Sequence, residues 1–169
     1  MEFMGCYAKL CADKSNKTAL NFLGYIKSFL AYTKKEYPNI PDLLDDNVRP
    51  KTPVQNVIYL TWDELMLFFH SSIKKEWELY RDMFCFAAFT GLRISDLRAI
   101  KPSNIFNDTI HIVIQKTGTA ISVELNKYSR CIYEKYKNIP NPQGTLFPYR
   151  NASHYNVVIK DIAKELGIN

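Results

Sequence analysis

Apolar side chains recur at helical spacing in six segments of the chain. The pattern predicts helices over residues 17–36, over a segment that begins at Thr61, and over residues 76–89, 95–100, 127–137 and 152–166. The residues predicted to face inward are Ala19, Phe22, Leu23, Ile26, Phe29 and Leu30 in the first helix, Trp77, Tyr80, Phe84, Ala87 and Ala88 in the third, and Tyr155, Val158, Ile159, Ile162 and Leu166 in the last.

The residues that flank these segments predict where several helices begin and end. Thr61 and Glu64 have the spacing of a capping box, in which each side chain bonds the backbone of the other. Gly91 suits the end of the third helix, because glycine adopts the left-handed conformation at low cost. Asn151 and Gly167 are predicted to cap the last helix at its two ends.

The period changes from helical to alternating after residue 104. Ile110, Ile112 and Ile114 alternate with other residues, and the chain returns as a strand over residues 120–125. Between them lies a turn at 116–119, where Gly118 supplies the positive φ that such turns require. A short strand at 105–106 is predicted to precede them. The fold class is therefore mainly α with a small antiparallel β-sheet.

Four prolines punctuate residues 38–57, which we interpret as a linker between two parts of the chain. Residues 1–37 then contain one amphipathic helix, and residues 58–169 form the second part. One helix cannot make a domain, so we expect its packing partners to be missing or supplied by another chain. Exchange of such a helix between copies predicts a swapped dimer.

Composition narrows the class of protein. Hydrophobic residues make up 47% of the 169 residues, enough to build a core. No run of eighteen apolar residues and no secretory leader is recognisable, so we expect a cytoplasmic protein without a membrane partner. The cysteine spacing matches no zinc pattern, which favours reduced thiols over disulfides or a metal site; the cysteines are Cys6, Cys11, Cys85 and Cys131. The histidines are scattered and fit no metal site; they are His70, His111 and His154. No cofactor is expected.

The net charge is +5, and the excess is densest between residues 93 and 137, with eight Lys or Arg against four Asp or Glu. Such an excess is compatible with a polyanionic partner, but it is common in unrelated proteins.

Arg93 stands out because it follows a predicted glycine-capped helix end, which places it on an exposed elbow. Asp96 lies three residues on and can reach the guanidinium to fix its orientation. A guanidinium held in this way presents a planar fork of donors that suits phosphate. A purely structural Arg–Asp pair is the alternative interpretation.

The run AFTGLRISDL at 88–97, followed by Ile100, resembles the first conserved box of the tyrosine recombinases of the phage integrase family. YLTWDEL at 59–65 resembles the start of their catalytic domain, and the helix at 17–36 resembles the last helix of their core-binding domain. LFP at 146–148, Asn156 and the helix ending at Gly167 resemble the segment before their second box.

The resemblance implies roles for three residues. Arg93 would be the first catalytic arginine, which clamps the scissile phosphate, and Asp96 its supporting acid. Lys116, in the turn between the strands, would be the general acid for the leaving 5′ oxygen. The partner would be double-stranded DNA, and the intact parent protein would act as a tetramer, without ATP or metal, in site-specific recombination or integration of a mobile element.

The family's second box, His-x-x-Arg, does not occur in the sequence, and no tyrosine lies in the context of the family's nucleophile. We therefore expect the chain alone to be inactive in strand cleavage, since covalent catalysis needs a nucleophile. Two alternatives stay open. The chain could be a non-catalytic or regulatory DNA-binding module, or a protein-interaction module that docks through the helix at 17–36.

Overall fold

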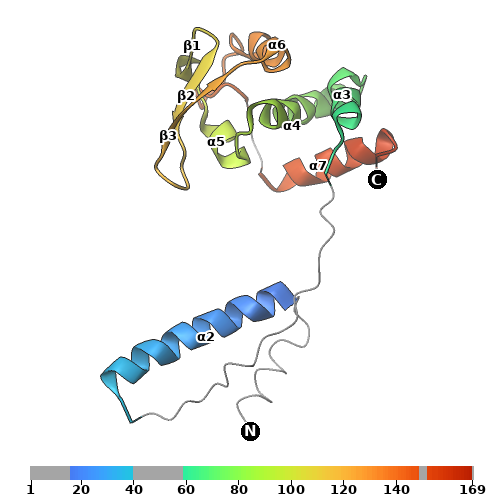
Figure 1. The fold of residues 1–169 in the computed structure, drawn as a ribbon. Helices are drawn as coiled ribbons and strands as arrows, with labels where there is room; N and C mark the ends of the chain where they lie inside the picture. The colour runs from blue at the N-terminus through green and yellow to red at the C-terminus, as the bar shows by residue number, and fades with distance from the viewer. Residues whose placement is uncertain (1–15, 40–58, 149–151, 169) are drawn as a thin grey trace. The chain divides into compact units, whose positions relative to one another are not determined.

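The computed structural model describes residues 16–39, 59–148 and 152–168 (Figure 1). The chain divides into two compact units, Met1–Ile58 and Tyr59–Asn169. Within the described ranges, no helix is long and apolar enough to cross a membrane. The predicted linker at 38–57 and the predicted cap Asn151 fall largely or wholly outside these ranges, as do Cys6 and Cys11.

The first unit contributes one described helix, α2 (Asn16–Glu36), which matches the predicted helix. The predicted inward face is only partly correct. Ala19 and Leu23 are buried, but Phe22 and Phe29 are 43% and 64% exposed. Successive residues of a helix are about 100° apart, so Phe22 points well away from Leu23, and one covered side cannot bury both.

The second unit contains the remaining elements. Its helices are α3 (Trp62–His70), α4 (Glu78–Thr90), α5 (Ile94–Ala99), α6 (Lys127–Tyr136) and α7 (Ala152–Glu165), with 3₁₀ turns η1 (Lys75–Trp77) and η2 (Pro102–Asn104). The strands are β1 (Ile105–Phe106), β2 (Thr109–Val113) and β3 (Ala120–Glu124). The prediction of a mainly helical fold with a small antiparallel sheet is confirmed.

Helix α4 is the centre of the core, because it packs against α3, α6 and α7 (Figure 1). Its fully buried residues include Met83, Cys85 and Phe86, whereas Ala88 is exposed. The predicted inward face was therefore wrong at Ala88. A central helix is covered on several sides, so its buried residues do not follow the single stripe of a surface helix. In α7 the prediction is better, since Tyr155, Val158 and Ile162 are buried.

The predicted helix ends are confirmed where the structure describes them. Thr61 caps α3, and the reciprocal bonds between Thr61 and Glu64 complete the capping box. These hydrogen bonds lower the pKa of Glu64. Gly91 ends α4 with φ of 69°, and Gly167 follows α7 with φ of 72°.

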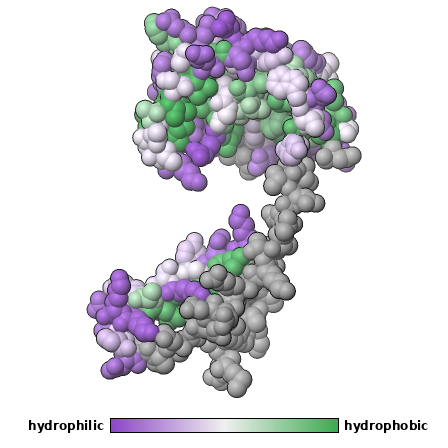
Figure 2. All heavy atoms as spheres, viewed as in Figure 1, coloured by the Kyte–Doolittle hydropathy of each residue, from purple (hydrophilic) through white to green (hydrophobic). Residues whose placement is uncertain are grey.

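The sheet has the order β1-β2-β3 and is antiparallel throughout. Asn107 and Asp108 both have positive φ, which is the backbone of a type I′ hairpin turn between β1 and β2. Ile110 pairs with Val123 and faces the core, whereas the other face leaves Phe106 and Val113 exposed. Figure 2 shows apolar residues at the surface on this sheet side of the unit.

A buried carboxylate joins α4 to α6. Asp82 accepts hydrogen bonds from Tyr136 Oη at 2.9 Å and Lys135 Nζ at 2.7 Å, and it pairs with Arg81 at 2.8 Å. Burial, followed by the charge of Asp82, raises the pKa of Tyr136. Partial burial opposes the charge of Lys135, but its bonds to the two carboxylates outweigh this and raise the pKa. The network fixes α6, the helix that follows β3.

Candidate functional site

Arg93 lies on the exposed elbow between α4 and α5, as predicted. The elbow is fixed on both sides. Thr90 is buried and donates its hydroxyl to Phe86 O at 2.7 Å, and Leu92 is buried in the core. Arg93 is the N-cap residue of α5, and its carbonyl accepts from Leu97 N at 2.9 Å. The backbone is therefore anchored while the guanidinium extends from an exposed residue.

Asp96 has a different partner from the one predicted. It is only 3% exposed, and its Oδ1 accepts a hydrogen bond from the backbone N–H of Gln115 at 2.9 Å. Its Oδ2 has no hydrogen-bond partner among the described residues, so the expected pair with Arg93 does not form there. The physical reason is direction: α5 turns Asp96 into the fold, whereas Arg93 precedes the helix and stays outside.

This bond has a consequence for Lys116. Gln115 opens the turn between β2 and β3, so Asp96 ties the base of that turn to the first turn of α5. The elbow that carries Arg93 and the hairpin that carries Lys116 are thereby joined by one charge-assisted hydrogen bond, a class that is stronger than neutral bonds.

Lys116 lies in the exposed turn between β2 and β3, as predicted. The turn is closed by hydrogen bonds from Gly118 N to Ile114 O and from Ile114 N to Thr119 O, both 2.8 Å long. Gly118 has φ of 68°, as the turn prediction required. The backbone at Lys116 is therefore held by the turn, whereas its side chain is exposed.

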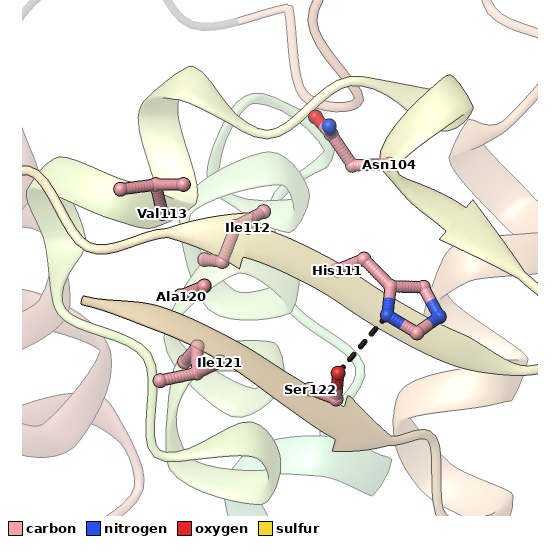
Figure 3. Close-up of a pocket in the computed structure, with 7 residues that line it drawn as sticks. All are labelled: Asn104, His111, Ile112, Val113, Ala120, Ile121 and Ser122. Carbon is pink, nitrogen blue, oxygen red and sulfur yellow. Dashed lines mark hydrogen bonds between the residues drawn. The ribbon is translucent and has the colours of Figure 1, made fainter. Parts of the chain in front are cut away.

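Two hollows lie near the hairpin, and one of them is beside the Asp96–Gln115 bond. This one, of about 170 Å³, is lined by Asp96, Asn104 and Gln115 together with apolar residues of β2 and of the C-terminal end of α5. A larger one, of about 400 Å³, lies over β2 and β3 (Figure 3). There His111 Nδ1 and Ser122 Oγ are 3.0 Å apart and form a cross-strand pair. Neither hollow has the enclosed shape of a small-molecule site.

The basic residues of this region differ in how they are neutralised. Arg130 pairs with Asp108 at 2.8 Å, Lys135 with Glu78 and Asp82, and Lys137 with Glu134 at 2.6 Å. Within the described part of the chain, Arg93 and Lys116 have no ion-pair partner. Two positive side chains on adjoining, anchored backbone segments are therefore available to an external anion.

Within the described ranges, no group of three or more His, Cys, Asp or Glu is placed to hold a metal ion. Cys85 is buried and Cys131 is exposed, and both are free thiols. Sequence reasoning missed Gln115, which acts through its backbone amide. A backbone role leaves no trace in side-chain type, so no pattern could have indicated it.

Comparison with known proteins identifies the family. Residues 59–169 match the model of the phage integrase family, which covers more than half of the chain. No curated protein matches the sequence.

Two solved structures share the fold. The integrase of mycobacterium phage Brujita aligns with a TM-score of 0.53 at 15% identity, over 93% of this chain and 54% of that one. The crystal structure of XerA recombinase aligns with a TM-score of 0.54 at 16% identity, over 98% of this chain and 68% of that one. The chain thus spans about half the length of the Brujita integrase. With two thirds of its residues matched to the family model, the chain belongs to the phage integrase family.

Proposed function

We propose that the protein takes part in site-specific DNA strand exchange, and that Tyr59–Ile168 supplies its phosphate-binding and proton-donating part. Family membership and fold support a recombinase. The observation that carries the residue assignment is the hydrogen bond from Gln115 N to Asp96 Oδ1, which joins the Arg93 elbow to the Lys116 hairpin.

In this proposal Arg93 binds the scissile phosphate. A guanidinium presents two parallel N–H donors to two phosphate oxygens, and it can hold the additional negative charge of a pentacoordinate transition state. The exposed position of Arg93 and the anchored elbow beneath it fit this role.

Lys116 is proposed as the general acid. When the phosphorus–oxygen bond to the 5′ side breaks, the leaving oxygen takes a proton, and the Lys116 ammonium supplies it. Asp96 is then a positioning residue, because it holds the amide of the neighbouring residue and not the phosphate. This differs from the role first expected for it, which was to orient Arg93.

The nucleophile is proposed to lie outside these 169 residues, since the sequence holds no His-x-x-Arg box and no tyrosine in a matching context. The chain by itself is then proposed to bind DNA without cleaving it. Duplex DNA and further copies of the protein, four in the assembled parent, are the proposed partners, and the cytoplasm is the proposed location.

The test is DNA binding by the whole chain as a function of salt, measured by fluorescence anisotropy on a labelled duplex. Each phosphate contact adds about 0.9 to the slope of log K against log salt. We expect Arg93→Ala and Lys116→Ala each to weaken binding and lower the slope by about 0.9, whereas Lys160→Ala, an exposed α7 lysine, leaves the slope nearly unchanged.

The outcomes separate the proposals. Equal effects of all three variants would mean that binding depends on net charge alone and would contradict the assigned site. Cleavage of a nicked or intact duplex by the chain alone, seen as a covalent protein–DNA adduct, would overturn the proposal that the nucleophile lies elsewhere.

A further inference from the structure

The side-chain amide of Asn126 forms hydrogen bonds through both its oxygen and its nitrogen. Oδ1 accepts from the backbone N–H groups of Tyr128 and Ser129, at 3.0 and 2.9 Å, and so caps the N-terminus of α6. Nδ2 donates to the backbone oxygen of Phe89 at 3.3 Å, across 37 residues of sequence. A helix cap needs only the acceptor, because the first turn of a helix has free N–H groups. The bond to Phe89 therefore has a role other than capping.

The acceptor of this second bond lies where α4 leads into the elbow. The last carbonyl groups of a helix have no partner within the helix, and that of Phe89 is one of them, since the final bond of α4 goes to Ala87 O. Gly91 follows in the left-handed conformation, and Arg93 comes two residues later. The Asn126 bond thus fixes the peptide plane from which the elbow starts.

The elbow's other hydrogen bonds are local in sequence. Thr90 Oγ1 donates to Phe86 O at 2.7 Å, and Leu97 N donates to Arg93 O at 2.9 Å. Bonds between such close neighbours set the shape of the elbow. They do not set its position relative to the β2–β3 hairpin.

That position is set by two bonds from the ends of the hairpin. At the turn, Gln115 N donates to Asp96 of α5. Where β3 has ended, Asn126 donates to Phe89 of α4. Because the elbow joins α4 to α5, the two bonds hold it from both sides. Together they limit how far Arg93 can move relative to the hairpin.

Asn126 is itself held firmly enough to act as an anchor. The preceding Leu125 is buried, and its N–H donates to Asp108 O at 2.7 Å. Tyr128, two residues further on, stacks on Phe89 with ring centroids 5.0 Å apart and planes 21° from parallel. Such stacking adds to the stabilisation from burial. The start of α6 and the end of α4 are therefore joined by a ring contact as well as by the hydrogen bond.

We propose that Asn126 is a positioning residue for Arg93, which places the guanidinium by holding the peptide of Phe89. It does not touch the phosphate. The inference rests on the proposed function, in which Arg93 binds that phosphate. The alternative is that Asn126 only caps α6, and variants that keep the cap but lose the donor distinguish the two roles.

Asn126→Ser is such a variant. Serine is among the preferred N-cap residues, but its side chain is too short to cap α6 and to reach Phe89 as well. Duplex binding by the full chain is measured by fluorescence anisotropy at low salt, where weakened variants still bind. We expect Asn126→Ser to weaken binding about fivefold, the contribution of one net hydrogen bond. Asn138→Ser, at an exposed asparagine just after α6, is the matched control and should bind like the unaltered chain.

A double-variant cycle shows whether Asn126 acts through Arg93. If it does, Asn126→Ser weakens binding in the unaltered chain but not in the Arg93→Ala background. A purely structural role would weaken binding equally in both backgrounds. Circular dichroism checks the helix content of each variant. If Asn126→Ser loses helix, Asn126→Asp takes its place, since the carboxylate keeps the cap and has no donor, and Asn138→Asp is then its charge-matched control.

The outcomes separate this inference from the proposed function. Equal weakening in both backgrounds would overturn the positioning role of Asn126. So would unchanged binding by the Asn126 variant while Arg93→Ala weakens binding, and neither result affects the proposed function. Unchanged binding by Arg93→Ala would overturn the proposed function, and the positioning role with it.

Discussion

Loss of the hydrogen bond between Asp96 and Gln115 should loosen the turn at Gln115 more than it lowers the global stability of the fold. Asp96→Ala removes the acceptor of the Gln115 amide, and hydrogen bonds to charged groups contribute about 1.5–3 kcal/mol. The same carboxylate has a buried oxygen without a partner, whose desolvation opposes folding. We therefore expect global stability to fall by only about 1 kcal/mol, because the two terms partly cancel.

The turn itself should loosen more. If opening of the Gln115 amide becomes about 2 kcal/mol easier, its hydrogen exchange accelerates roughly 30-fold, since about 1.4 kcal/mol is a factor of ten. Amide exchange followed by NMR measures this residue directly. Glu124→Ala removes an exposed carboxylate from the same hairpin and should leave the Gln115 amide unchanged.

A consequence for binding follows from the same bond. Asp96→Ala should weaken DNA binding about as much as Lys116→Ala, and the double variant should be little worse than either, because both act through the hairpin. An unchanged exchange rate for Gln115 in Asp96→Ala would refute the reasoning. Full additivity of the two substitutions would likewise separate Asp96 from Lys116.

Two further predictions concern stability, which urea unfolding can follow through the fluorescence of Trp62 and Trp77. Burial, with the nearby charge of Asp82, raises the pKa of Cys85 from 9 to about 12. The unfolded thiol therefore loses its proton at a lower pH than the folded one, so the contribution of Cys85 to stability falls between pH 9 and 12, by about 2 kcal/mol at pH 10.5. Cys85→Ala should lack this part of the loss, whereas the part due to Tyr136, whose pKa is also raised, should remain. Asp82→Ala removes the acceptor of the buried network and should lower the free energy of unfolding by about 3 kcal/mol at pH 7. A loss below about 1 kcal/mol would contradict the structural role of the network.

The elements and most helix ends could be predicted from local patterns. Alternation of the isoleucines in β2, the capping box at Thr61 and positive φ at Gly118 all depend on neighbours along the chain. Burial depends on what packs from elsewhere. For this reason Phe29 and Ala88 were wrongly predicted to face the core, and the buried Met83 was not predicted to do so.

The candidate site likewise combines features that local sequence predicts with one that depends on a distant part of the chain. The exposed elbow of Arg93 and the turn of Lys116 follow from local sequence, and both are where they were expected. The partner of Asp96 is nineteen residues away and is a backbone group, so it becomes visible only when the hairpin is folded against α5. The sequence could suggest that Asp96 supports the site, but not which part of it.

The most direct test of the proposed DNA-binding site is an NMR titration of the ¹⁵N-labelled chain with a short duplex at moderate salt. The account predicts that amides of Gly91 to Asp96 and of Gln115 to Thr119 shift together, while those of η1 and α7 stay in place. Shifts confined to α7 or η1, with the elbow and the hairpin unaffected, would contradict it.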